Sequence, residues 1–155
     1  MRITDVILPR DIMVGLKSRN KTDLFNEIVD FLAEEEDLPN TDSVKKALWA
    51  REKMLSTGIM PKIALPHAQI KGLKKTVGMI GLSREGIEYE TLDGEPVHIV
   101  MFFADDEMDS VGHLQTLRNA AQLASNPRFY SRMIQAMTSM EAYQSLKYFE
   151  ELEDI

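Results

Sequence analysis

The sequence predicts an α/β fold, with a mixed parallel and antiparallel sheet flanked by helices on both faces. Helical periodicity occupies both ends of the 155-residue chain, and short apolar runs bounded by turn residues occupy its middle. Residues 97–104 are almost continuously apolar, which is typical of a strand covered on both faces. Several connections between the expected strands are too short for a helical crossover, so some neighbouring strands should run antiparallel.

The first element after an initial turn is a short strand over residues 12–16, followed by an amphipathic helix. Asn20 or Thr22 has the side chain of an N-cap, and apolar residues then recur at helical spacing to about residue 35. The sequence therefore predicts a helix over about residues 21–35 that packs one face against the sheet.

A second helix is expected to begin at Thr41 or Asp42, either of which can cap it. Arg51 falls on its apolar face, where the aliphatic stem can pack while the guanidinium reaches past the edge of the helix. We expect Gly58 to end this region in a left-handed conformation. The apolar positions that share the face with Arg51 are Val44, Ala47 and Leu48.

The middle of the chain contains the expected strands. Residues 63–67 are apolar but include Pro66, which excludes a central position and indicates an edge strand. Residues 76–82 and 86–89 read as two further strands, and residues 97–104 as the central one.

The C-terminal third reads as three helices. Residues 105–112 form an acidic run that we expect to be an exposed loop, and His113 then opens a helix. Asn126, followed by proline, is a strong helix start. Thr138 and Glu141 have the spacing of a capping box for the last helix.

Composition narrows the possible functions. The length fits one domain over residues 1–155, and the absence of cysteine excludes disulfides and thiolate sites. The net charge of −7 argues against a nucleic-acid partner. No apolar run approaches the roughly 18 residues of a membrane span, and the N-terminus does not read as a signal peptide. We therefore expect a cytoplasmic protein with no direct membrane insertion.

The chain has three histidines, and each has a structural and a functional interpretation. His98 lies inside the apolar strand, which favours a structural role. His67 follows proline at the end of an apolar segment, where a side chain can project into a cleft, and His113 opens a helix. Their spacing is not that of a metal site, so we expect no metal and no cofactor.

The stretch from Arg51 to His67 suits the chemistry of phosphoryl acceptance. It combines a cation, the two adjacent hydroxyls of Ser56 and Thr57, and an imidazole. A hydrolytic triad built on either hydroxyl lacks a nucleophile-elbow pattern. Phosphoryl transfer instead needs alignment, positive charge and hydrogen-bond donors around three oxygens. An imidazole that is neutral near pH 7 can act as the nucleophile, so His67 is the candidate acceptor.

At these residues the sequence resembles the mannitol/fructose/nitrogen-regulatory type of enzyme IIA domain of the bacterial phosphotransferase system. The resemblance rests on Arg51-Glu52, Ser56-Thr57-Gly58-Ile59 and Ala64-Leu65-Pro66-His67. It extends over most of the chain and includes Ser18 to Leu24, Asp93-Gly94-Glu95-Pro96-Val97 and His113-Leu114.

The resemblance implies that His67 receives a phosphoryl group from an HPr-like phosphocarrier and passes it to a IIB domain. It also implies that Arg51, Thr57 and His113 line the same site, and it agrees with a mixed sheet flanked by helices. An alternative is a regulatory module of the nitrogen type that controls a transporter or kinase. Where the family usually has two glycines, this chain has Met60 and Lys62 on either side of Pro61.

Overall fold

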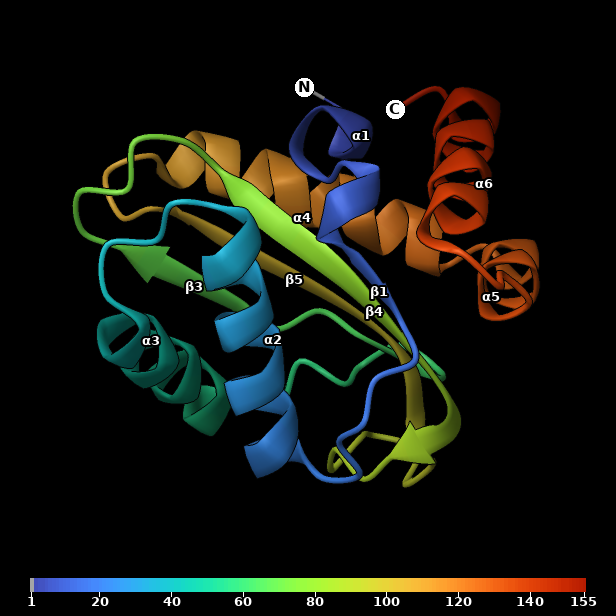
Figure 1. Ribbon diagram of the computed structural model, residues 1–155, viewed down its shortest axis with the longest axis horizontal. Helices are drawn as coiled ribbons and strands as arrows, with labels where there is room; N and C mark the ends of the chain where they lie inside the picture. The colour runs from blue at the N-terminus through green and yellow to red at the C-terminus, as the bar shows by residue number, and fades with distance from the viewer. Residues whose placement is uncertain (1) are drawn as a thin grey trace.

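The computed structural model describes residues 2–155 and has the predicted α/β architecture. A five-stranded mixed sheet lies between two layers of helices (Figure 1). In chain order the elements are α1 (Ile3–Val6), a 3₁₀ turn η1 (Pro9–Asp11), β1 (Ile12–Val14), α2 (Lys21–Glu35), α3 (Thr41–Met54), β2 (Ile63–Ala64), β3 (His67–Ile70), β4 (Val77–Ile87), β5 (Val97–Asp106), α4 (Ser110–Ala124), α5 (Pro127–Ile134) and α6 (Ser139–Glu153).

The sheet has the order β1-β4-β5, and both β2 and β3 pair with the remaining edge of β5. β4 and β5 run antiparallel, whereas β1 pairs with β4, and β2 and β3 with β5, in the parallel sense. β5 is therefore central, as residues 97–104 predict. Pro66 lies between the two short segments at the edge, also as predicted, because it has no N–H to give to a ladder.

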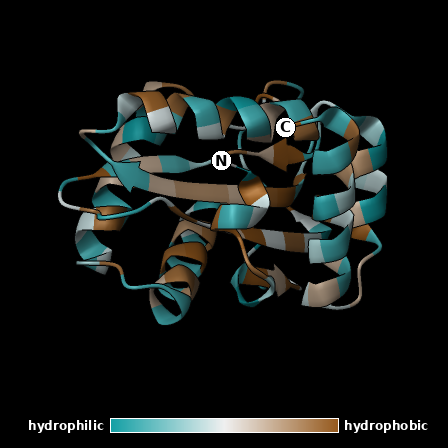
Figure 2. Ribbon diagram, turned by 90° about the horizontal axis from the view of Figure 1, so that it is seen from above, coloured by the Kyte–Doolittle hydropathy of each residue, from teal (hydrophilic) through white to brown (hydrophobic). Residues whose placement is uncertain are grey.

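Apolar side chains of β5 alternate between two separate cores. Ile99, Met101 and Phe103 pack in the core beneath α4, α5 and α6. Val100 and Phe102 face the opposite core, beneath α2 and α3. Figure 2 shows the apolar segments gathered along the strands between the helix layers, so the central strand is covered on both faces. Within residues 2–155, no helix combines the length and apolar character that a membrane crossing requires.

Helix starts follow the predicted capping chemistry with one exception. The side-chain oxygens of Asn20, Asn126 and Thr138 accept backbone N–H groups at the starts of α2, α5 and α6. The expectation of Thr41 or Asp42 as the cap of α3 was wrong. Asn40 is the cap and accepts from the N–H of Ser43, because α3 begins one residue earlier than that assignment requires.

Gly58 does not adopt the left-handed conformation that we expected. α3 ends at Met54, and Leu55 follows it in an extended conformation. Glycine is required at position 58 for a different reason. A Cβ atom there would lie 2.8 Å from Cγ2 of Thr91 and 2.9 Å from Cδ1 of Tyr89. The loop after α3 can therefore lie against the segment after β4 only because this residue has no side chain.

Two boundaries in the sheet also differ from expectation. The expected strands 76–82 and 86–89 are one strand, β4, whose register shifts between Leu82 and Ile87. Gly86 bends the chain within this irregularity at φ +96°. β5 continues to Asp106, so Asp105 lies in the sheet and is fully buried rather than in an exposed acidic loop.

Candidate active site

His67 lies at the start of β3, directly after the proline that interrupts the edge strand. Its backbone pairs in register with Phe103 of β5, and its side chain is 8% exposed. Nδ1 of the ring is 2.8 Å from the carbonyl oxygen of Leu65. Because a carbonyl can only accept a hydrogen bond, Nδ1 carries the proton and donates it to Leu65. The lone pair of this imidazole is therefore on Nε2.

Arg51 reaches that lone pair from α3. Its Nε–H donates to Nε2 of His67 over 3.1 Å, and one terminal NH₂ group donates to the carbonyl of Leu55 over 2.8 Å. The second bond holds the guanidinium against the end of its own helix. A planar cation is thus aimed at the one nucleophilic atom of the ring, in the geometry with which arginine binds phosphoryl oxygens.

The surroundings of His67 favour its neutral form. Burial lowers the pKa of His67 below its usual value, and the positive charge of Arg51 lowers it further. The hydrogen bond to Leu65 acts in the opposite direction but does not reverse the shift. His67 is therefore a neutral imidazole near pH 7, with an available lone pair on Nε2.

The structure brings His113 to His67, from the first turn of α4. The two ring centroids lie 5.1 Å apart at an interplanar angle of 55°. Nδ1 of His113 donates to Oδ2 of Asp105 over 2.6 Å, and Oδ1 of the same carboxylate accepts from the hydroxyl of Thr76 over 2.5 Å. Buried Asp105 thus orients the second imidazole, which leaves Nε2 of His113 as the atom available to a ligand.

Ser56 and Thr57 have different environments although they are adjacent. Thr57 is buried, and its hydroxyl lies between Glu52 and Tyr89 at 2.7 Å from each. Its backbone N–H also donates to Glu52, whose carboxylate pairs with Lys21 over 3.1 Å. The hydroxyl of Ser56 accepts the N–H of Gly58 over 3.2 Å, and its own proton can be donated to another acceptor.

Sequence reasoning missed the buried residues that position this site. Glu52 is 5% exposed and Lys21 is 8% exposed, yet each reads as an ordinary surface charge on a helix. The only signal for Glu52 was its place beside Arg51 in the family motif. Asp105 gave no such signal, because it begins a run of acidic residues that is typical of a loop.

His98 lies apart from the other two histidines, as its place in the central strand predicts. Its Nδ1 is 2.8 Å from the carbonyl oxygen of Ser83, and its ring stands edge-on to Tyr130 with centroids 6.2 Å apart. No three histidine, aspartate or glutamate side chains gather as metal ligands anywhere in residues 2–155.

Met60, Pro61 and Lys62 form a tight turn before β2. The N–H of Ile63 approaches the carbonyl of Met60 at 3.4 Å, and Lys62 has φ +67°. Proline at the second position and a left-handed residue at the third are the features of a type II turn. The two side chains that replace the usual family glycines are thus accommodated, at some backbone strain at Lys62.

Comparison with known proteins identifies the family of the chain. Residues 6–148 match the model of a family described as phosphoenolpyruvate-dependent sugar phosphotransferase system, EIIA 2. A nitrogen regulatory protein of Pseudomonas aeruginosa is 27% identical over 146 residues, which cover 93% of this chain and 94% of that protein. The fructose-specific EIIABC component of Bacillus subtilis is 30% identical over 136 residues, and the match covers 88% of this chain but about a fifth (21%) of that protein.

Solved structures have the same fold. The nitrogen regulatory protein IIA-Ntr of Neisseria meningitidis superposes with a TM-score of 0.86 at 26% identity, over 93% of this chain and 98% of that one. The mannitol IIA of Escherichia coli gives a TM-score of 0.75 at 18% identity, over 88% and 96% of the two chains, and supports the fold alone. The chain belongs to the EIIA 2 family of the phosphoenolpyruvate-dependent sugar phosphotransferase system.

Proposed function

We propose that His67 accepts a phosphoryl group from an HPr-like phosphocarrier and passes it to a IIB domain. The observation that carries this proposal is the hydrogen bond from Arg51 to Nε2 of His67, opposite the bond from Nδ1 to Leu65. A ring held in this tautomer presents one nucleophilic nitrogen next to one cation. Residues 1–155 act in this proposal as one EIIA domain.

The transfer step requires no metal and no cofactor. The lone pair of Nε2 attacks phosphorus, the bond between phosphorus and the donor nitrogen breaks, and its electron pair stays on the donor. The proton on Nδ1 stays on Nδ1, because the Leu65 carbonyl holds it throughout. Such a transition state is loose, so alignment and charge around the phosphoryl oxygens contribute most of the catalysis.

Arg51 exchanges partners in this step. Its Nε–H leaves the lone pair of His67 and donates to a phosphoryl oxygen as the new bond to Nε2 forms. The bond to Leu55 keeps the guanidinium in place during this exchange. Ser56 offers a hydroxyl proton to the phosphoryl group, whereas Thr57, held by Glu52 and Tyr89, supports the loop that carries Ser56.

His113 supplies the second donor. When it is protonated, its Nδ1–H pairs with Asp105 and its Nε2–H is free to donate to a phosphoryl oxygen. The spacing of 5.1 Å between its ring and that of His67 leaves a phosphoryl group within reach of both. Asp105 holds the ring of His113 in the orientation that leaves Nε2 available to the phosphoryl group.

A rim of exposed apolar side chains supports a protein as the phosphoryl donor. Met54 and Leu55 follow Arg51 at the end of α3, Met108 precedes α4, and Val111 and Leu114 flank His113; each is more than half exposed. Exposed apolar residues that gather around a functional group are typical of a protein-binding surface. A solved complex of mannitol IIA with phosphorylated mannitol IIB from Escherichia coli has this fold, which supports a IIB domain as the acceptor.

A regulatory module is the second candidate, and the relatives favour it. The nitrogen regulatory protein of Bradyrhizobium diazoefficiens is 31% identical over 79% of this chain and 80% of its own length. In this case the apolar rim would bind a transporter or kinase, either through the fold alone or in a manner that depends on phosphorylation of His67, and transfer activity would be reduced.

The test is phosphorylation with phosphoenolpyruvate, enzyme I and HPr. We expect an acid-labile, alkali-stable phosphoryl group on the wild-type protein and none on His67→Gln. His98→Gln is the matched control and should be phosphorylated normally. A subsequent incubation with phosphoryl-accepting IIB domains separates a carrier from a regulator. A wild-type protein that HPr does not phosphorylate would contradict the carrier and would favour a regulatory module that acts through its fold alone.

A further inference from the structure

A cavity lies between the turn before β2 and the junction of α4 and α5, and none of the residues that contact His67 lines it. It has a volume of about 520 Å³, within the usual range for small-molecule sites. The turn before β2 forms one wall, and the junction of α4 and α5 forms the other. Its lining residues are Met60, Pro61, Lys62, Ala124, Ser125, Pro127, Tyr130 and Ser131.

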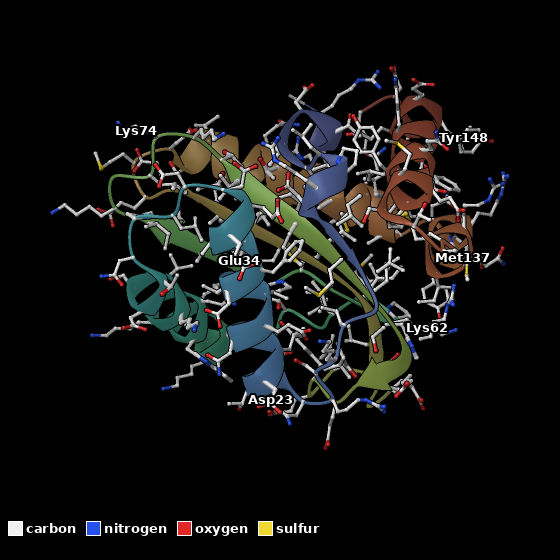
Figure 3. All side chains as sticks on the ribbon, in the orientation of Figure 1. Asp23, Glu34, Lys62, Lys74, Met137 and Tyr148 are labelled. Atoms are coloured by element: carbon white, nitrogen blue, oxygen red, sulfur yellow. The ribbon has the colours of Figure 1, made fainter. Side chains whose placement is uncertain are left out.

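Lys62 is one of the residues that line this cavity, and Figure 3 shows it on the same side of the molecule as α5. Its carbonyl accepts the N–H groups of both His98 and Ile99, at 2.8 and 3.1 Å, so its backbone is tied to the start of β5. Its φ of +67° is one that glycine adopts without steric cost and lysine does not. The chain therefore has a long cationic side chain at a position where the left-handed backbone would suit glycine.

The ammonium group of Lys62 lies over an aromatic ring. Its Nζ is 4.6 Å from the ring centroid of Tyr130 on α5. This contact orients the side chain along the cavity wall without neutralising its charge, because an aromatic ring carries no formal charge. No carboxylate is among the described residues that line the cavity, so its charge is positive in a chain of net charge −7.

The two serine hydroxyls of the cavity are already in use. The hydroxyl of Ser125 donates to the carbonyl of Gln122, and that of Ser131 donates to the carbonyl of Pro127. The start of α5 is satisfied by Asn126, whose side-chain oxygen accepts the N–H of Arg128. The Lys62 ammonium is therefore the charged donor that a ligand would meet, beside the hydroxyl of Tyr130, and the rest of the wall is largely apolar.

We propose that this cavity binds a small organic anion with a flat apolar body, such as an aryl carboxylate or sulfonate. The anionic group pairs with the ammonium of Lys62. The apolar body lies against the flat aromatic ring of Tyr130 and packs on the apolar rings of Pro61 and Pro127. The site is independent of phosphoryl chemistry at His67.

The test uses the fluorescent probe 8-anilinonaphthalene-1-sulfonate and its uncharged analogue N-phenyl-1-naphthylamine. We expect 1:1 binding of the sulfonate to the full chain, about tenfold weaker binding of the uncharged analogue, and about tenfold weaker sulfonate binding to Lys62→Gln, since each change removes one charge-assisted contact. Lys53→Gln, which removes an exposed lysine of α3, is the matched control and should bind like wild type.

Two further measurements locate the site and control for folding. Amide shifts caused by the sulfonate should cluster at residues 60–62 and 124–131. Lys62→Gly, which suits the left-handed backbone, should have a melting temperature no lower than that of Lys62→Gln. It should also bind the sulfonate about tenfold more weakly than the wild type does. Equal sulfonate affinity in Lys62→Gln and wild type, equal affinity for the two probes, or amide shifts clustered elsewhere would overturn the proposal. Phosphorylation by HPr should be unchanged in both Lys62 variants, so failure here is separable from failure at His67.

Discussion

Arg51 donates from Nε to Nε2 of His67 over 3.1 Å, and this bond occupies the one lone pair on the imidazole. The cation therefore stands where an arriving phosphoryl group must go. Its movement from the ring nitrogen to the phosphoryl oxygens is a required part of the proposed transfer.

Arg51→Lys should slow phosphorylation of His67 by roughly ten- to a hundredfold, although the charge is kept. A lysine ammonium is a point charge. It cannot donate to the carbonyl of Leu55 and to the phosphoryl oxygens at the same time in the geometry that the planar guanidinium allows. Single-turnover transfer from phosphorylated HPr measures the effect, with Lys53→Gln on the same helix as the control. An unchanged rate in a folded Arg51→Lys protein would show that the guanidinium of Arg51 does not contribute to transfer.

His113→Ala should reduce the transfer rate by about a hundredfold, the typical cost of losing one preorganised donor. His113→Gln should recover part of that loss, because its amide can still donate. Asp105→Asn should reduce the rate by roughly tenfold, because the carboxylate that orients the ring of His113 is gone. Melting temperatures are the control. A rate that follows stability alone across these variants would make His113 a packing residue.

The pH dependence of phosphorylation should show a nucleophile with a lowered pKa. Burial and Arg51 lower the pKa of His67, so its neutral form persists below pH 6.5. The rate attributable to His67 should be level above pH 6.5 and should fall only at lower pH. The pKa of His67 is lower in the folded chain than in the unfolded chain. At pH values between the two, the unfolded chain binds more protons at this residue, so the free energy of unfolding also falls as the pH falls. Histidine ring NMR measures the titration directly, and a midpoint at or above 6.5 would contradict this environment.

Asp11→Asn should stabilise the protein at neutral pH. The pKa of Asp11 is raised from 3.8 to about 6, mainly by burial and also by the nearby Glu36, against the opposing hydrogen bond from Leu8. Its Oδ1 is the buried side-chain atom without a hydrogen-bond partner in residues 2–155. Because the folded chain binds the proton more tightly, stability falls as pH rises from about 4 to about 6, by at most about 3 kcal/mol.

Urea unfolding at pH 4 and pH 7.5 tests this prediction. The amide oxygen of Asn can still accept from Leu8, as Asp11 does over 2.9 Å. We expect little difference between Asp11→Asn and wild type at pH 4 and a gain for the variant at pH 7.5. Asp37→Asn, which changes an exposed aspartate next to Glu36 in the sequence, is the control. An equal effect of Asp11→Asn at both pH values would show that proton binding at Asp11 is not linked to folding.

The sequence was sufficient for the fold because local signals agree with the tertiary structure. Asn20 and Thr138 cap the helices that their side chains predict, and residues 97–104 form the central strand. Pro66 excludes a central position and indeed lies at the edge of the sheet. These features depend on short-range chemistry or on burial of one continuous apolar run, both of which are visible in one sequence.

The supporting residues could not be predicted, because their role depends on partners far away in sequence. Asp105 is buried because β3 pairs alongside β5 and brings the carboxylate between His113 and Thr76. Gly58 is required by Thr91 and Tyr89, which approach it from beyond β4. Neither an acidic run nor a glycine after a helix carries information about such contacts.

The most direct test of His67 as the phosphoryl acceptor is to locate the phosphoryl group on a single nitrogen. The protein labelled with ¹⁵N-histidine is phosphorylated by HPr, and one-bond ³¹P–¹⁵N coupling identifies the modified atom. Because Nδ1 of His67 carries a proton that it donates to the Leu65 carbonyl, we expect the coupling at Nε2 of His67. Coupling at Nδ1 of His67, or at either nitrogen of His113, would contradict it.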